Sequence, residues 1–369
     1  MHFGGCPLRW RALIPRISSG PALALGSALL FGASTPLAKL LLGVADPLLL
    51  AGLLYLGSGL GLALLTAAAR ASGRERAEAP LQGRDLPWLA AIVLFGGVLG
   101  PALLMGGLAL TPASTTSLLL NVEGLATMTI AWIVFRENVD QRIFVGAMAI
   151  LAGAVLLSWP DGGIANARID WGSVLIVLAC LAWGIDNNLT RRLSAADPVQ
   201  IAMIKGVAAG TVNLTLALAW GAHIPGPGAL AGAAALGFFG YGVSLVLFVL
   251  GLRALGTART GAYFSTAPFI GALIALLLFG EPVTLPLAGA SLLMALGIYL
   301  HLTEAHAHKH VHQPLDHAHR HVHDAHHQHV HARGDPAGEP HSHGHRHERL
   351  VHKHPHYPDL HHRHEHENA

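Results

Sequence analysis

The side chains best suited to chemistry are histidines crowded near the C-terminus. The chain has 26 histidines in 369 residues, and 24 of them lie between His301 and His366. Neutral imidazole is a ligand for Zn²⁺, Ni²⁺, Cu²⁺ and Co²⁺, and alternating histidines in an extended strand present two ligands to one ion. We therefore expect Zn²⁺ or Ni²⁺ to bind weakly at His306, His308, His310, His312, His317, His319, His321, His323, His326, His327, His329 and His331.

The segment that carries these histidines, residues 304–369, has a composition that cannot build an apolar core. We predict that it is a disordered tail and that its metal binding has no fixed geometry. The same imidazoles also suit a charge switch, which is nearly neutral above about pH 7 and binds anionic lipid when protonated near about pH 5.5. Both uses make the tail an accessory to the rest of the chain.

A second set of candidate residues surrounds a carboxylate in a very apolar stretch. Glu123 is the only charged side chain between Asp85 and Arg136. A carboxylate inside a membrane helix costs roughly 2.5–3.5 kcal/mol, so it should face a cavity or a partner. Glu123 is thus either a contact for a substrate amine, a proton carrier, or one half of a structural pair.

Other polar residues are predicted to share a substrate site with Glu123, although Tyr263 and Ser265 also suit simple helix packing. Lys205 could neutralise Asp186 or Glu123, but it lies only a few residues into its predicted helix, which favours snorkelling to the interface. The candidate substrate-binding residues are Glu123, Asn121, Thr127, Trp183, Asp186, Asn187, Thr35, Tyr263 and Ser265.

Membrane helices must position these residues, because the composition is that of a membrane protein. The mean hydropathy is +0.49 even with the polar tail included, and charged residues make up 12% of the chain. One membrane-spanning helix needs about 20 apolar residues. The apolar runs predict an all-α polytopic protein with ten transmembrane helices, at 20–42, 48–69, 87–109, 114–135, 142–159, 171–190, 198–220, 229–252, 260–280 and 284–303.

The distribution of arginine predicts the orientation. With residues 1–19 as a cytoplasmic arm, the cytoplasmic segments hold thirteen arginines, whereas the opposite side holds Lys39 and Arg168. The positive-inside rule then places the N-terminus in the cytoplasm, and ten spans return the tail to the same side. We expect a multi-pass protein of a cell membrane, such as a bacterial inner membrane.

Internal similarity divides the spans into two units, 20–160 and 171–303. Residues 31–47 align with 183–198 across one gap, and residues 107–139 align with 251–283 at a constant offset of 144. Because each unit holds five predicted helices, the second must insert upside down relative to the first. Inverted repeats are typical of secondary transporters, whose substrate site lies between the halves.

These motifs resemble the drug/metabolite transporter superfamily, specifically its EamA-type members, over about residues 20–303. The resemblance rests on "LLLNVEG" with Glu123, "FREN" with Glu137, "FGEP" with Glu281, and the "GAMAILAGAVLL" and "GASLLMALGIYL" that follow. It implies two inverted five-helix units and transport of amino acids, other metabolites or drugs. Gly124 stands where the family pattern often has proline.

The sequence therefore predicts a secondary transporter, with export the favoured direction, that moves small metabolites or drug-like solutes by alternating access. The alternatives are a divalent-metal transporter and a metal-responsive membrane sensor that uses the tail. We expect no enzyme, because no nucleophile with a base and no phosphate loop occurs in the spans. The expected partners are lipid, a small solute and divalent metal ions, without nucleic acid or a required cofactor.

Overall fold

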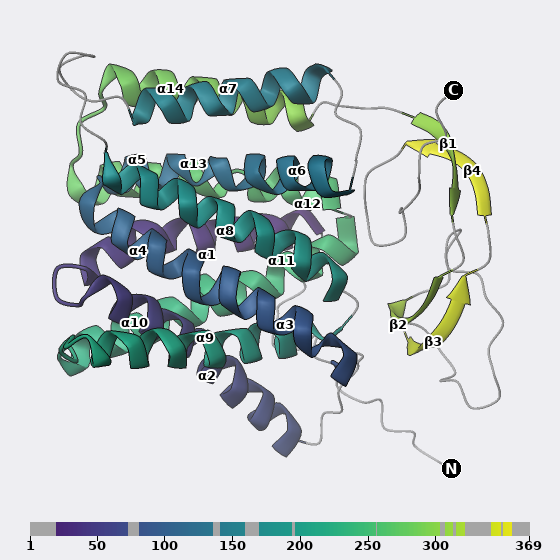
Figure 1. The fold of residues 1–369 in the computed structure, drawn as a ribbon, viewed down its shortest axis with the longest axis horizontal. Coiled ribbons are helices and arrows are strands. Elements are labelled where there is room, and N and C mark those ends of the chain that lie inside the picture. Colours follow the sequence, from purple (N-terminus) through teal and green to yellow (C-terminus); the bar gives the residue numbers. More distant parts are fainter. Residues whose placement is uncertain are drawn as a thin grey trace, which may run out of the picture.

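The fold is a bundle of membrane-length helices, with short strands beside it (Figure 1). The structure is a computed structural model. Seven of its helices are long and apolar enough to cross a membrane, and three further apolar helices are shorter. The residues that it describes are 20–72, 81–135, 141–158, 170–193, 196–255, 257–302, 307–312, 315–321, 341–347 and 350–355.

Within these residues the helices form ten spans, as the apolar runs predicted, and five belong to each repeat. In the first repeat the third span is continuous from η2 to α4, and the fourth consists of two helices. The bounds are α1 (Gly20–Leu41), α2 (Pro47–Ala71), η2 (Gly83–Asp85), α3 (Leu86–Ile92), η3 (Val93–Leu99), α4 (Gly100–Leu110), α5 (Ala113–Leu119), α6 (Asn121–Phe135) and α7 (Gln141–Leu157).

The second repeat has the same plan. Its third span runs from α10 to α11, and its fourth span is again divided in two. The bounds are α8 (Trp171–Leu193), α9 (Pro198–Ala219), α10 (Pro227–Leu236), η5 (Gly237–Val243), α11 (Ser244–Leu255), α12 (Thr257–Phe264), α13 (Ala267–Phe279) and α14 (Leu285–Leu302).

The second span of each repeat begins in the same way, at an Asp-Pro pair. Asp46 precedes α2, and its side chain accepts a hydrogen bond from Leu48 N at 2.9 Å. Asp197 precedes α9, and its side chain accepts one from Val199 N at 2.9 Å. Proline suits the first helical position, where its missing N–H costs nothing, and aspartate caps the free N–H groups that follow.

Two irregularities recur in both repeats. The third spans contain π-helical segments, η3 and η5, at equivalent positions. The fourth spans, predicted as single helices over 114–135 and 260–280, are interrupted: α5 gives way to α6 at Leu120, and α12 to α13 at Ser265 and Thr266. Hydrophobicity did not reveal the interruptions because each is only one or two residues long and is flanked by apolar residues on both sides.

The two repeats interlock through small residues. Helices α2 and α9 cross so closely that a Cβ added at Gly206 would lie 2.6 Å from Gly59 N, and one at Gly210 would lie 2.5 Å from Leu56 N. Such close approach of backbones is typical of membrane helix packing. This crossing joins the second span of one repeat to the second span of the other.

The fifth spans, α7 and α14, pack against each other in a separate layer of the bundle (Figure 1). A Cβ on Gly153 would meet Met294 and the carbonyl of Ala290, whereas one on Gly297 would meet Ile150 and the carbonyl of Gly146. Each member of the first contact is 144 residues from its counterpart in the second. This exchange of partners is what a two-fold relation between inverted halves requires.

The tail contains four short strands, β1 (Ala307–His312), β2 (Leu315–His321), β3 (His341–His347) and β4 (Leu350–Pro355). Strand β1 pairs with β4 and β2 pairs with β3, both antiparallel. His306, His323, His326, His327, His329 and His331 lie outside the described residues, so for the tail as a whole disorder stays a prediction.

Candidate functional site

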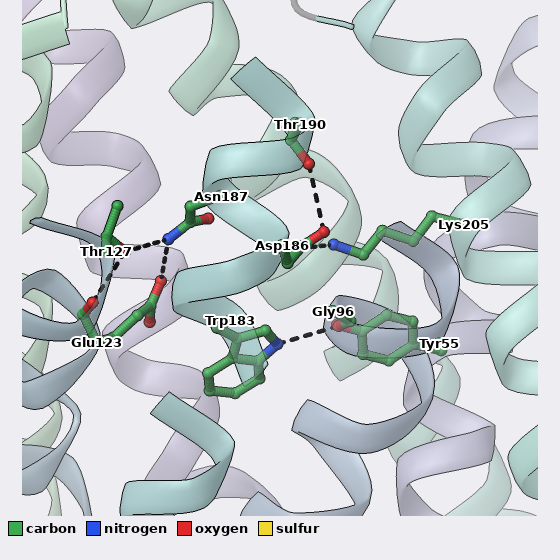
Figure 2. A network of polar contacts seen from close by, with 9 residues as sticks. All are labelled: Tyr55, Gly96, Glu123, Thr127, Trp183, Asp186, Asn187, Thr190 and Lys205. Carbon is green, nitrogen blue, oxygen red and sulfur yellow. Dashed lines mark hydrogen bonds and ion pairs between the residues drawn. The ribbon is translucent and has the colours of Figure 1, made fainter. Parts of the chain in front are cut away.

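A polar network lies inside the bundle, where α6 of the first repeat meets α8 of the second (Figure 2). Glu123 is half-buried in the first turn of α6, immediately after the interruption of the fourth span. Its Oε1 accepts a hydrogen bond from Asn187 Nδ2 at 2.9 Å, and the same Nδ2 lies 3.2 Å from Thr127 Oγ1. Three residues predicted to share a site, from two repeats, are thus brought together.

The neighbouring side chain, Asp186, turns to the opposite side of α8 (Figure 2). Its Oδ2 lies 2.5 Å from Lys205 Nζ of α9, and its Oδ1 accepts a hydrogen bond from Thr190 Oγ1 at 3.3 Å. The side chains of Lys205 and Asp186 are only 10% and 7% exposed. Snorkelling of Lys205 to the interface was therefore the wrong expectation, because seven residues of helix place it about 10 Å inside its span, beside a buried carboxylate.

The π-helical segment η3 forms one wall beside this ion pair. A Cβ added at Gly96 would overlap the Asp186 carboxylate, so glycine is required for the two helices to approach. The carbonyl oxygen of Gly96 accepts hydrogen bonds from Tyr55 Oη at 2.7 Å and from Trp183 Nε1 at 3.0 Å. Two donors from other helices thus satisfy a backbone carbonyl in a stretch of irregular helix.

The other half of the bundle has the same geometry without the charges. Ser34 of α1 is the repeat equivalent of Asp186, and it lies against Gly240 of η5, where an added Cβ would come within 2.7 Å of Ser34 Cβ. Counted from the Asp-Pro pairs, the equivalent of Lys205 is Leu54, which is 1% exposed. The ion pair is therefore an asymmetric addition to a symmetric scaffold.

Aromatic rings join the polar network to the first and ninth spans. The Phe31 ring lies 6.2 Å from the Trp183 ring, 6.0 Å from that of Tyr241 and 5.4 Å from that of Phe264. The contacts with Trp183 and Tyr241 are edge-to-face, and the contact with Phe264 is tilted. Phe31 and Phe264 are half-buried, so part of their apolar ring surface is accessible. Phe31 contacts Trp183, which lies in the same network as Glu123 (Figure 2).

The remaining predicted site residues lie outside this network. Asn121 is buried and donates to Leu118 O at 2.8 Å and to Met294 Sδ at 3.5 Å, so its side chain is directed towards α14. Thr35 is 1% exposed within α1. Tyr263 and Ser265 are half-buried at the end of α12 and in the interruption that follows.

Two charged side chains, Lys39 and Glu281, lie where the first, third and ninth spans end and the fourth span begins. Glu281 accepts hydrogen bonds from Ala113 N at 2.9 Å and from Ser114 N at 3.0 Å, which caps the start of α5. Lys39 Nζ donates to Thr111 O at 2.9 Å, beyond the end of α4. Both placements match the helix dipole, and Glu281 acts here as a helix cap. Glu137, its repeat equivalent, lies outside the described residues.

Five participants were absent from the predicted set of substrate-binding residues: Tyr55, Gly96, Asn188, Thr190 and Lys205. Asn188 Nδ2 donates to Thr127 O at 3.0 Å and to Gly184 O at 2.8 Å. A signal for it existed in the consecutive polar run Asp186, Asn187, Asn188. Nothing comparable marked Gly96, because glycine is common throughout these spans.

The comparisons with known proteins agree with this architecture. Residues 18–159 and 170–303 each match the EamA-like transporter family. A protein of Methanothermobacter thermautotrophicus described as an "Uncharacterized transporter" is 28% identical over 282 residues, which are 73% of this chain and 82% of that protein.

A solved structure titled "Crystal structure of protein" is similar in fold, with a TM-score of 0.58 and 20% identity. The match covers 77% of this chain and 99% of that one. At this identity the likeness concerns the fold alone. Together, the two matched segments span most of the chain, and each corresponds to one five-helix repeat. The chain is a multi-pass membrane transporter, and it belongs to the EamA-like transporter family.

Proposed function

We propose that the protein is a secondary transporter that moves small organic solutes bearing a basic amine, by alternating access between its two repeats. The observation that carries the proposal is the position of Glu123. It is half-buried beside an interrupted span, and its carboxylate is held by Asn187 of the opposite repeat. In transporters with inverted repeats, substrate sites lie at the repeat interface and are built from discontinuous helices.

The charges of the network support an amine as the group recognised. Asp186 is already paired with Lys205, whereas the one side-chain hydrogen bond that Glu123 accepts from the described residues comes from a neutral amide, at Oε1, so we take Oε2 as the oxygen that contacts the ligand. An ammonium group beside Glu123 would offset the cost of keeping a carboxylate among apolar helices. The half-buried rings of Phe31 and Phe264 suit the apolar part of the same solute.

The proposed orientation places both termini in the cytoplasm of a cell membrane, such as a bacterial inner membrane. It rests on the arginine excess of the loops assigned to that side. Export is then movement from the tail side to the side of the 110–113 connection. Metal transport by the bundle is less well supported: within the described residues no group of three or more His, Cys, Asp or Glu side chains is placed to hold an ion.

The test uses purified protein in vesicles of known orientation and solutes in matched pairs. Each pair consists of an amine and its analogue with a methyl group in place of the amine. The proposal predicts counterflow of at least one amine and no counterflow of its analogue, and flux from the tail side would support export. Equal flux of both members of every pair would contradict recognition by Glu123.

A further inference from the structure

The interrupted fourth span of each repeat gives the bundle two comparable pairs of half-helices. At the offset of 144, α5 corresponds to α12 and α6 corresponds to α13. The two-fold relation between inverted repeats therefore makes contact between α5 and α13 equivalent to contact between α12 and α6. The first pair lies towards the side of the 110–113 connection, here called the connection side, and the second pair lies towards the side from which α14 leads into the tail.

The two pairs are packed differently. Helix α5 packs against α13, whereas α6 packs mainly on α8, and α12 packs mainly on α1 and α11. A Cβ added at Gly271 of α13 would lie 2.7 Å from Gly32 O and 2.8 Å from Ser117 Oγ of α5. A Cβ added at Gly124 of α6 or at Gly261 of α12 would have nothing within 4 Å. The bundle is thus closed around α5 and α13 and looser around α6 and α12.

The burial of the side chains follows the same division. Every residue of α5 except Thr115 is buried. On α6, in contrast, Glu123 is half-buried, and its partner Asn187 on α8 is exposed (Figure 2). Polar side chains at membrane depth face a partner or water rather than lipid. We therefore infer that water reaches this network from the tail side, because α5 and α13 close the connection side.

A polar contact between the two repeats ties the closed pair together. Helix α13 ends at Gly280, whose φ of 61° lies in the left-handed region that favours glycine. The next residue, Glu281, accepts hydrogen bonds from Ala113 N at 2.9 Å and from Ser114 N at 3.0 Å, and its carboxylate also contacts Ser114 Oγ. These partners are 168 and 167 residues away in sequence, so the carboxylate joins the end of α13 to the start of α5 in the other repeat.

We propose that Glu281 is a latch, which holds the connection side closed in a conformation that is open towards the tail. Separation of α5 from α13 would exchange the hydrogen bonds of this carboxylate for bonds to water, so the contact favours the closed pair. The interruptions at Leu120 and at Ser265 and Thr266 are the points at which each span can bend. The inference rests on the alternating access of the proposed function, and it does not depend on which solute is carried.

The experiment measures how fast one cysteine reacts with a membrane-impermeant thiol reagent, added to one side of vesicles with known protein orientation. Cys6→Ser and Cys180→Ala first remove the two thiols of the chain. Ser117→Cys then reports on the closed pair, because this side chain is buried against α13 and its hydroxyl has no hydrogen-bond partner among the described residues. Thr127→Cys reports on the tail side, since Thr127 is half-buried in the network with Asn187.

The latch variant is Glu281→Gln, and the matched control is Asp46→Asn. Asp46 also caps a helix on the connection side, but it accepts hydrogen bonds from Leu48 N at 2.9 Å and Leu49 N at 3.3 Å within its own repeat. Ser114→Ala is a milder second variant, which removes only the hydroxyl contact with Glu281. All three changes are made in both reporter backgrounds.

With the latch intact, Thr127→Cys should react from the tail side only, and Ser117→Cys should react slowly from either side. Glu281→Gln should speed the reaction of Ser117→Cys from the connection side by about tenfold, because hydrogen bonds to a charged group are the stronger class. Ser114→Ala should speed it by a smaller factor, and Asp46→Asn should leave it unchanged.

Three outcomes would overturn the proposal. They are an unchanged reaction of Ser117→Cys in both latch variants, an equal acceleration by Asp46→Asn, and an equal acceleration from both sides of the membrane, which would indicate loss of folding rather than opening. Reaction of Thr127→Cys from the connection side with the latch intact would contradict the conformation assigned here. A failure of amine counterflow would alter none of these rates, so the latch and the choice of solute are tested separately.

Discussion

The buried ion pair between Lys205 and Asp186 makes a quantitative prediction about stability. Lys205→Met removes the cation and leaves the Asp186 carboxylate, whose side chain is 7% exposed, with the Thr190 hydroxyl 3.3 Å away as a donor. A carboxylate stranded in this way is costly: breaking a buried pair from one side destabilises a protein by about 3–5 kcal/mol. We expect a loss of unfolding free energy in that range.

The double variant Asp186→Asn with Lys205→Met should recover most of the loss, since it removes both charges and keeps similar side-chain volumes. Replacing a whole buried pair by neutral groups is often close to neutral. Unfolding of the detergent-purified protein can be followed through the thiol of Cys180, which is buried and free in α8. A Cys6→Ser background removes the second thiol of the chain.

The expected order of stability is wild type, then the double variant, then the single variant. A Lys205→Met protein as stable as the wild type would refute the reasoning, because the pair would then contribute nothing inside the bundle. A double variant no more stable than the single one would also refute it, since the loss would then come from packing of the lysine side chain rather than from an unpaired charge.

Three further predictions follow from other parts of the structure. Gly206→Ala should destabilise the protein by about 1–3 kcal/mol, since the new Cβ would lie 2.6 Å from Gly59 N. The control Gly83→Ala, whose new Cβ would have nothing within 4 Å, should change the free energy of unfolding little. Equal effects of the two variants in unfolding assays would contradict the close crossing of α2 and α9. Deletion of residues 305–369 should leave membrane insertion and the unfolding temperature of the bundle unchanged, and a shortened protein that fails to reach the membrane would be the contrary result. Zn²⁺ binding by the tail should be strong near about pH 7.5 and largely lost near about pH 5.5, because protonation of imidazole, with a reference pKa of about 6.5, competes with the metal. Equal calorimetric heats of Zn²⁺ binding at the two pH values would contradict this prediction.

The spans and the inverted repeat were predictable because apolar length and internal similarity are direct properties of the sequence. Glu123 could be found in the same way, as a single carboxylate in a long apolar run. Asn187 was also among the predicted site residues, because polar side chains gather on the sixth predicted span. What these signals have in common is that each contrasts with its apolar surroundings.

The fine structure of the site was not predictable by the same reasoning. The interruptions at Leu120 and Ser265 are too short to divide an apolar run into two spans. The role of Gly96 depends on the close approach of a neighbouring helix, which no local signal in the sequence reports. The position of Lys205 was misjudged because its short distance from the helix start suggested snorkelling, whereas its carboxylate partner in the preceding helix, α8, decides its position. Strand pairing in the tail likewise depends on register, which the alternating sequence alone leaves open.

Amine flux through Glu123→Gln, compared with Glu281→Gln at matched expression, tests the central claim most directly. Both changes remove one carboxylate charge, but Glu123 lies between the repeats in the network with Asn187, whereas Glu281 caps the start of α5. A hydrogen bond to a charged group contributes about 1.5–3 kcal/mol, so we predict at least a roughly tenfold loss of flux for Glu123→Gln and a smaller loss for Glu281→Gln. Equal losses in the two variants, or full flux in Glu123→Gln, would contradict a transport site at Glu123.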